Sequence, residues 1–390
     1  MSGPVYVKRV DTYATDACSE AVEAIFAALP CTKQIGPDTK ILLKPDLLAR
    51  RAPEMAITTH PEIVRAVIRA CKNRGAAARN ITVADSAGGV YNPAQMRALY
   101  RETGMAAVCE SEGVCAYSEC ETVKVPAAGG VAAAEFELLR PVAEADFIID
   151  LPKFKTHVMT GLTAACKNMF GTIPGLEKAE WHMRFPERDR FGEMLIDLLC
   201  TVRPQMAILD GIVGMEGDGP SGGEPRPLGL LLAGEDLPSL DLAAAALIRL
   251  DPMRVPYLAA AHRRGLCGER FDMALLQGDV DAFVPPSPPW KLPSNFAGQA
   301  LGSTDMADRA PALLRPAARV AERYVAPHPV VNASACIGCG KCAEICPQHT
   351  IRMEQGCSHI VRKNCIRCFC CHEMCPVKAI EVCQLKLFRL

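Results

Sequence analysis

The chain has 390 residues, of which 49% are hydrophobic and 22% are charged. This composition excludes an intrinsically disordered chain, which would combine low hydrophobicity with high net charge. The 43 basic and 44 acidic residues almost cancel, which argues against a protein that coats nucleic acid through its overall charge.

The first 280 residues alternate short apolar runs with amphipathic stretches, which predicts an α/β domain with a mostly parallel sheet. Strands are expected at residues 5–10, 40–44, 80–84, 145–151, 206–209 and 228–233. Helices are expected at residues 16–29, 61–73, 93–103, 161–170, 190–202 and 237–250. Asp16 is the expected N-cap of the first helix.

A proline-rich segment at residues 285–293 is the best candidate for a linker between domains. One or two further helices are expected at residues 306–324. The sequence therefore predicts an α/β domain at residues 1–284, a linker region at 285–329 and a small C-terminal α+β domain at 330–390. No apolar run is long enough to cross a membrane, and the first residues lack the apolar core of a signal peptide. We therefore expect a cytoplasmic protein with no membrane span.

Cysteine is unusually frequent and unevenly distributed. Of the 20 cysteines, 11 lie between Cys336 and Cys383. A secreted disulfide scaffold would be cysteine-rich throughout, whereas this distribution indicates a large ordinary domain followed by a small metal domain. Within that region the run Cys336–Pro347 recurs as Cys365–Pro376, 29 residues later.

Both runs have the spacing Cys-x-x-Cys-x-x-Cys-x-x-x-Cys-Pro, which is typical of bacterial ferredoxins with two 4Fe-4S clusters. Three closely spaced thiolates can reach one cubane, and the fourth reaches the other cluster. The expected ligands of the first cluster are Cys336, Cys339, Cys342 and Cys375. Those of the second are Cys365, Cys368, Cys371 and Cys346. Zinc ribbons, the main alternative, usually pair two Cys-x-x-Cys arms instead. Cys357, Cys370 and Cys383 are spare and expected to act as small hydrophobes.

Basic side chains follow the strand expected at residues 145–151. Lys153, Lys155 and His157 alternate along an extended segment, so they face one side. This position, just beyond a strand end, is where open α/β sheets bind ligands. Lys167 and Asn168 return to the same region one helix later. The group favours an anionic or carbonyl-bearing ligand, and the alternative is a solvated strand end with exposed lysines.

A glycine-rich stretch at residues 210–223 follows another strand. Its carboxylates, including Asp210 and Glu216, could bind a cation, orient a lysine or move a proton. The alternative is a long flexible turn. The stretch matches neither a Walker nor a Rossmann fingerprint. Asp85 and Ser86 begin a further loop of this kind after the strand at residues 80–84.

Five motifs, in this order, resemble the domain-of-unknown-function 362 family. They are residues 43–47, 84–86, 151–157, 167–171 and 210–211. The resemblance extends over most of residues 5–280 and implies an architecture found in bacteria and archaea, often fused to a ferredoxin-type pair of clusters. One residue departs from it, because Asp46 stands where asparagine is expected.

These features predict an iron-sulfur oxidoreductase that passes electrons from two 4Fe-4S clusters to a small molecule above the sheet. The expected catalytic residues, which should converge in one cleft facing a cluster, are Lys153, Lys155, His157, Asp85 and Asp210. The expected substrate-binding residues are Lys44, Ser86, Lys167, Asn168 and Glu216. A redox partner protein or a low-potential donor would supply the electrons. The alternatives are an electron carrier or maturation factor that docks a partner protein, and a binding protein that the clusters only stabilise. Trp181 and His182 form either a lid or, as the simpler alternative, a packed surface loop.

Overall fold

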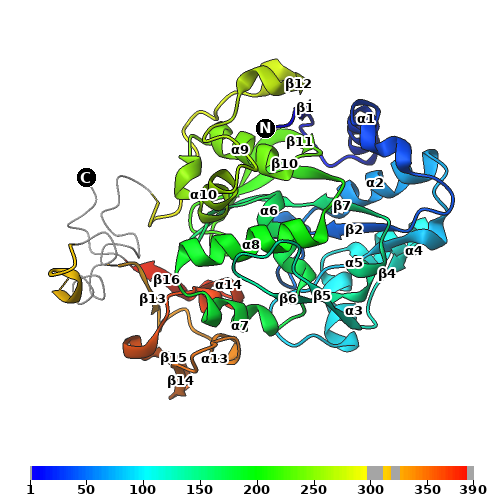
Figure 1. Cartoon of the computed structure of the whole chain (residues 1–390). Helices are drawn as coiled ribbons and strands as arrows, with labels where there is room; N and C mark the ends of the chain where they lie inside the picture. The colour runs from blue at the N-terminus through cyan, green and yellow to red at the C-terminus, as the bar shows by residue number, and fades with distance from the viewer. Residues whose placement is uncertain (1, 297–310, 318–325, 384–390) are drawn as a thin grey trace.

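The computed structural model describes residues 2–296, 311–317 and 326–383 (Figure 1). Within them the largest element is a ten-stranded sheet whose main order is β12-β1-β11-β10-β7-β2-β3-β4, with β8 paired to β10 and β9 paired to β8. The strands on one side of this order are β1 (Val5–Arg9), β10 (Met206–Glu216), β11 (Glu224–Gly234) and β12 (Leu276–Gly278). The others are β2 (Ile41–Pro45), β3 (Ile81–Val83), β4 (Cys115–Ala116), β7 (Phe147–Leu151), β8 (Lys153–His157) and β9 (Gly161–Thr163).

The centre of the sheet is parallel. Strands β4, β3, β2, β7 and β10 pair in parallel, whereas β11 pairs antiparallel with both β10 and β1. The predicted α/β domain with a mostly parallel sheet is therefore confirmed. Because β2, β3 and β7 run in the same direction, the residues that follow them meet at one edge, where such sheets bind ligands.

Helices cover both faces of the sheet (Figure 1). One face packs against α1 (Thr15–Ala28), α2 (Pro61–Asn73), α3 (Pro93–Glu102) and α4 (Met105–Glu112). The other packs against α6 (Ala165–Asn168), α8 (Arg188–Val202), α9 (Leu237–Leu247) and α10 (Pro256–Arg263). Helix α2 shows why the sequence forms such a layer, because Ile63, Val64, Val67, Ile68 and Cys71 recur at helical spacing and are all buried.

Three local predictions are wrong. Asp16 lies in the first turn of α1 and is not its N-cap, since the helix begins after Ala14 without a side-chain cap. The helix expected at 161–170 starts only at Ala165, because Gly161–Thr163 pairs with β8 as a strand. Strand β10 does not end at Leu209, because pairing with β11 carries it through an irregularity near Gly211 to Glu216.

A β-hairpin packs on a helix that contacts the C-terminal part of the chain. The hairpin consists of β5 (Thr122–Pro126) and β6 (Glu135–Leu139) and is followed by α5 (Arg140–Glu144). The helix, α7 (Glu177–Arg184), comes later in the chain. Trp181 and His182, considered above as a lid or a surface loop, lie in α7 and are buried.

The C-terminal part, here called the cysteine-rich segment (residues 326–383), is a small α+β unit, as predicted. Its strands form two antiparallel pairs, β13 (His328–Val331) with β16 (Ile380–Cys383) and β14 (Ile351–Glu354) with β15 (Cys357–Ile360). Its helices α13 (Lys341–Glu344) and α14 (Cys370–Met374) occupy equivalent places in the two cysteine runs. In Figure 1 the segment, coloured orange to red, lies at one end of the α/β part, next to α7.

The proline-rich segment expected as a linker packs against the α/β part as far as the structure describes it. The Trp290 ring is buried and meets Phe154 edge-on at a centroid distance of 5.6 Å. Phe296 is buried too. Of the helical region expected at 306–324, only 311–317 falls within the described residues. In the described part of the chain, no helix is long and apolar enough to cross a membrane.

Candidate functional site

Three basic side chains of β8 each meet a carboxylate from a different part of the chain. The Nζ of Lys153 lies 2.8 Å from Asp210, and the Nζ of Lys155 lies 2.8 Å from Asp46. The third pair joins His157 Nε2 to Glu373 Oε1 at 3.2 Å. The three basic side chains are at most 1% exposed, so these lysines do not form a solvated strand end.

A fourth buried ion pair joins a lysine of β2 to the aspartate that follows β3. The Nζ of Lys44 is 2.8 Å from Asp85 Oδ1, and both side chains are buried. Gly171 passes so close that a Cβ added there would lie 2.1 Å from Asp85 Oδ1 and 2.5 Å from Lys44 Nζ. Glycine is therefore required at 171 for this ion pair to form.

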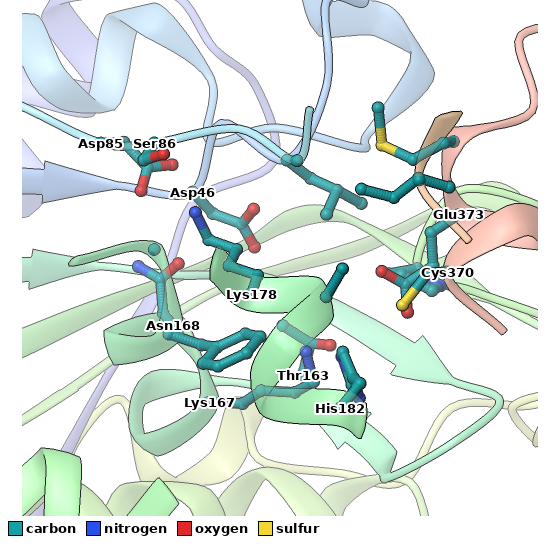
Figure 2. A pocket seen from close by; sticks show the side chains of 18 of the residues that line it. Asp46, Asp85, Ser86, Thr163, Lys167, Asn168, Lys178, His182, Cys370 and Glu373 are labelled. Carbon is teal, nitrogen blue, oxygen red and sulfur yellow. The ribbon is translucent and has the colours of Figure 1, made fainter. Parts of the chain in front are cut away.

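Four side chains of these pairs, Asp46, Asp85, Lys155 and Glu373, border a cavity of about 70 Å³ between the sheet edge and the cysteine-rich segment (Figure 2). Its volume allows a few water molecules or one small molecule. From the sheet side it is lined by Asp46, Asp85, Ser86, Lys155 and Thr163. From the helices it is lined by Lys167, Asn168, Lys178, Ala179 and His182. The cysteine-rich segment contributes Ile345, Cys370, Glu373 and Met374.

Hydrogen bonds fix the short helix α6 beside the cavity. The carboxylate of Asp241, in α9, accepts from the backbone N–H groups of Ala165 and Cys166 at 2.8 and 2.9 Å, which caps the start of α6. At the other end of α6, Asn168 Nδ2 donates to Asp150 at 2.7 Å. Asn168 Oδ1 accepts from Lys44 Nζ at 3.2 Å. The amide of Asn168 thus holds the wall in place and has little capacity left for a ligand.

The hydrogen bonds of His157 show which nitrogen of its neutral ring carries the proton. His157 Nδ1 accepts from the backbone N–H of Met159 at 3.0 Å, so a neutral ring carries its proton on Nε2. That nitrogen faces Glu373 and can donate to it. Burial lowers the pKa of His157 to about 3, so its ring is neutral at pH 7. Burial raises the pKa of Glu373, but the facing His157 and Lys167 keep it below the ordinary carboxyl value. At neutral pH the pair is therefore a close contact between a neutral imidazole and a carboxylate.

Three polar groups that line the cavity have no hydrogen bond or ion pair with any residue that the structure describes. Thr163 Oγ1 and His182 Nδ1 are buried without a hydrogen bond in the described part of the protein. The ammonium of Lys167, whose residue is 9% exposed, forms no hydrogen bond or ion pair with any described residue. Buried polar groups nearly always have partners, so these three indicate where a bound molecule would be held.

The predicted site residues therefore fall into separate groups. Of the five residues expected in one cleft, only Lys155 and Asp85 line the cavity; His157 contacts it through Glu373. Lys153 and Asp210 lie outside it, because both are bound to the hydroxyl of Tyr13 at 2.8 Å.

The expected substrate-binding residues also divide. Ser86, Lys167 and Asn168 line the cavity, whereas Lys44 lies behind Asp85. Glu216 lies elsewhere and binds Arg226 at 2.6 Å.

The first residue of the glycine-rich stretch orients a lysine, because Asp210 pairs with Lys153, and later residues of the stretch contact the cysteine-rich segment. Ser221 Oγ donates to the backbone oxygen of Glu373 at 2.8 Å, and Lys378 Nζ donates to that of Gly223 at 2.7 Å. His372 Nε2 lies 2.9 Å from the backbone oxygen of Asp218. A Cβ on Gly222 would lie 2.5 Å from the His372 ring. In this structure the stretch holds the cysteine-rich segment against the sheet.

The thiols predicted to bind the second cluster surround one space. Cys346, Cys365, Cys368 and Cys371 line the same small cavity. This arrangement brings the last cysteine of the first run to the first three of the second, as the spacing predicts. The four thiols fit the expected donor set of a 4Fe-4S cluster. No three His, Cys, Asp or Glu residues among those described are placed to hold a single metal ion.

The thiols predicted to bind the first cluster lie around Ser358. The Ser358 hydroxyl is 3.5 Å from Cys336 Sγ and 3.1 Å from Cys342 Sγ. Its hydrogen bond lowers the pKa of Cys336 to about 7, which favours the thiolate that iron binds. Cys375 is buried in the same apolar group as Cys342, and Cys339 is exposed.

Cys370, expected to be a spare buried thiol, separates the second set of thiols from the cavity. It is 6% exposed and packs with Ile345, Ala179 and the half-buried Cys368. Because Cys370 also lines the cavity, one layer of side chains lies between a predicted cluster ligand and the space where a molecule could bind.

Several residues of the site were missed. Lys178 and Ser358 belong to no motif, and Glu373 stands at an unspecified position of the second cysteine run. Only the fold brings Lys178 and Glu373 to one cavity and Ser358 to the first set of thiols. Thr163 lies between two motifs of the family resemblance, in the strand that was predicted as helix. His182 was considered only as part of a lid or of a packed surface loop.

Two segments of the chain match known protein families. Residues 41–246 match the family described as "Domain of unknown function (DUF362)", and residues 329–352 match "4Fe-4S binding domain".

Individual relatives were also compared. The thylakoid-associated protein sll1697 of Synechocystis sp. is 34% identical over 240 residues, which cover 60% of this chain and 70% of that protein. A crystal structure from Thermotoga maritima is 14% identical, with a TM-score of 0.33, and the match covers 56% of this chain and 55% of that one. A likeness at that score supports no conclusion about the present fold.

Proposed function

The chain belongs to the DUF362 family and carries a 4Fe-4S binding domain, and from these facts and the cavity we propose an iron-sulfur oxidoreductase. In this proposal electrons pass from two 4Fe-4S clusters to an anionic or carbonyl-bearing small molecule bound between the sheet edge and the cysteine-rich segment. The 4Fe-4S match supports an iron-sulfur electron-transfer protein with at least one cluster. The second cluster, the substrate and the cytoplasmic location belong to the proposal.

One observation carries the proposal. The cavity has unpartnered polar groups on one side and the cysteine-rich segment on the other. A pure electron carrier needs no buried space with a free ammonium group at that position. Ligand pockets, in contrast, combine apolar walls with a few polar groups that orient the bound molecule.

The side chains around the cavity can bind and orient such a molecule. The two clusters would supply one electron each, and reduction of a carbonyl to an alcohol also takes two protons. Lys178, which lines the cavity and whose pKa burial lowers to about 7, can give one proton, and solvent can supply the other. Lys167 can hold the negative charge of an anionic substrate or stabilise charge that develops on a carbonyl oxygen, because its ammonium forms no hydrogen bond or ion pair with a described residue and lies 5.8 Å from the Phe170 ring centroid. The ion pairs of Lys155 and Lys44 keep the facing carboxylates in fixed positions.

A second function is favoured by the other end of the cysteine-rich segment. Cys339 is exposed, and the neighbouring Ile337 is 62% exposed. A redox partner could approach the first predicted cluster there, as an electron carrier would require. In the oxidoreductase the same surface would receive electrons.

We also propose that the chain is divided into an α/β domain at residues 1–284, a linker region at 285–329 and a C-terminal domain at 330–390. The packed part of the linker belongs to the first unit.

The test follows cluster oxidation in anaerobic, cluster-loaded protein reduced with dithionite. Small aldehydes, ketones and 2-oxo acids are added singly, and the visible absorbance of the oxidised clusters is recorded. We expect at least one compound to oxidise the clusters about tenfold faster in the native protein than in Lys167→Met, since one charged contact is worth about that factor. Lys124→Met, at an exposed position on β5, serves as the matched control. Equal rates in all three proteins for every compound would contradict the proposal.

A further inference from the structure

One lysine that lines the cavity has neither a hydrogen bond nor an ion pair among the described residues. Two ion pairs hold the carboxylates of the sheet side, and these are Lys44–Asp85 and Lys155–Asp46. Lys178 Nζ donates to the backbone oxygen of Ile173. The ammonium of Lys167 lies 5.8 Å from the centroid of the Phe170 ring, and no described carboxylate pairs with it.

Burial lowers the pKa of Lys167 and lowers that of Lys178 to about 7, and an anion bound beside them would oppose this effect. The neighbouring histidines supply no charge. Burial lowers the pKa of His157 to about 3 and that of His182 to about 4, so both rings are neutral at pH 7. Asp150 lies behind Asn168, and burial raises its pKa well above the ordinary carboxyl range. A buried positive charge without a partner is unfavourable, so an anion would stabilise this arrangement.

The free donors lie together on one side of the cavity. Figure 2 shows Lys167, Thr163 and His182 near one another, away from Asp85 and Ser86. Thr163 Oγ1 has no partner among the described residues. An ammonium and a hydroxyl are both donors, and together they suit an acceptor with two oxygen atoms.

The remaining wall and the size of the cavity restrict the ligand further. Phe170, Ala179, Ile345 and Met374 line it with apolar surface. Its volume of about 70 Å³ leaves room for only a few heavy atoms. The cavity is therefore suited to a small molecule with one anionic end and a short apolar part.

We propose that the cavity binds a small monocarboxylate whose carboxylate group is held by Lys167 and Thr163. This inference rests on the proposed function and names the substrate class of the same site. A dianion such as sulfate would bring a second negative charge into the cavity that Glu373 lines, and a neutral molecule would leave the ammonium of Lys167 without an ion-pair partner.

Acetate is the probe, with acetamide as its neutral isostere and sulfate as the dianion. Binding to oxidised, cluster-loaded protein is measured by calorimetry, so no turnover is needed. We expect one acetate per chain and about tenfold weaker binding of both acetamide and sulfate. Absence of acetate binding, or equal affinity for acetamide or sulfate, would overturn the inference.

Variants then locate the bound acetate. Lys167→Met and Thr163→Val should each weaken acetate binding, the first by about tenfold or more and the second by less, because a charged donor contributes more than a neutral one. Lys167→Arg should retain most of the affinity, and Lys124→Met all of it. Unchanged affinity in both Lys167→Met and Thr163→Val would overturn the assignment. If neutral carbonyl compounds oxidise the clusters in a Lys167-dependent way while acetate does not bind, the proposed function stands and only the monocarboxylate inference fails.

Discussion

His157 Nε2 lies 3.2 Å from Glu373 Oε1, so the strand that carries the basic motif and the helix between two predicted cluster ligands meet in one buried contact. Glu373 also lines the cavity. Binding of a molecule at Lys167 and docking of the cysteine-rich segment therefore share one carboxylate.

Removal of that carboxylate should loosen the docking. Glu373→Ala leaves the buried Nε2–H of His157 without an acceptor, which should lower the free energy of unfolding by about 1–3 kcal/mol. Glu373→Gln keeps an acceptor oxygen and should cost less. Chemical unfolding of cluster-loaded protein measures both, with iron content as a check. Glu354→Ala, at an exposed position on β14, is the control and should have no effect. Equal stability of Glu373→Ala and native protein would show that the contact contributes nothing.

The glycine-rich stretch should tolerate no side chain at Gly222. Gly222→Ala places a methyl group 2.5 Å from the His372 ring and 2.7 Å from the backbone oxygen of Asp218. The contact must open, at a cost of about 1–3 kcal/mol. We expect faster cleavage of the cysteine-rich segment in limited proteolysis and faster loss of iron in air. Gly36→Ala meets only Thr39 at 3.8 Å and should behave like the native protein. The same behaviour in Gly222→Ala would contradict the docking role.

The crossed ligation can be tested by iron analysis of paired substitutions. Two clusters correspond to about eight iron atoms per chain, and loss of one leaves about four. Cys346→Ala combined with Cys365→Ala should retain about four, because both thiols line one space. Cys336→Ala combined with Cys346→Ala should remove ligands from both clusters and leave fewer. If the first pair loses both clusters and the second only one, the assignment of Cys346 is wrong.

Acetate binding should weaken as the pH rises through about 7. Burial lowers the pKa of Lys178 to about 7, opposed by Asp85 and Glu177 and assisted by Lys44 and Lys167. Below that pH the ammonium is charged and favours the anion; above it the positive charge is lost. Calorimetry across this range should show the decline in the native protein. In Lys178→Arg the side chain stays charged, and the decline should largely disappear. A similar decline in that variant would assign the effect to another group.

Features of the fold and the site that depend on local sequence pattern could be predicted from the sequence. The apolar alternation predicts the sheet, and the spacing of Cys346 and Cys365 predicts that distant thiols share one space. The strand-end position predicts that Lys155 and Lys167 lie at a ligand site, and both line the cavity.

The remaining features depend on which partners the fold supplies. Nothing in the residues near Lys153 shows that Tyr13 and Asp210 enclose it away from the cavity. Glu373 reaches His157 only because the cysteine-rich segment docks on the glycine-rich stretch. The helix expected at 161–170 fails because pairing with β8 outweighs its helical pattern. Tertiary contacts of this kind leave no local signal.

The most direct test asks whether electrons leave the clusters through the cavity or at the surface near the exposed Cys339. Leu48 lines the cavity and is half-buried. Leu48→Trp should therefore fill the cavity without changing any charge. Leu313→Trp, at a position that is 92% exposed, is the control. Reduced, cluster-loaded proteins are oxidised either by the most effective carbonyl compound or by ferricyanide, which can take electrons near the exposed Cys339. We expect Leu48→Trp to slow oxidation of the clusters by the carbonyl compound by about tenfold or more, because a binding contact is lost. The rate of oxidation by ferricyanide should stay unchanged. Equal carbonyl rates in Leu48→Trp and Leu313→Trp would contradict this expectation, because electrons would then leave the clusters without passing through the cavity.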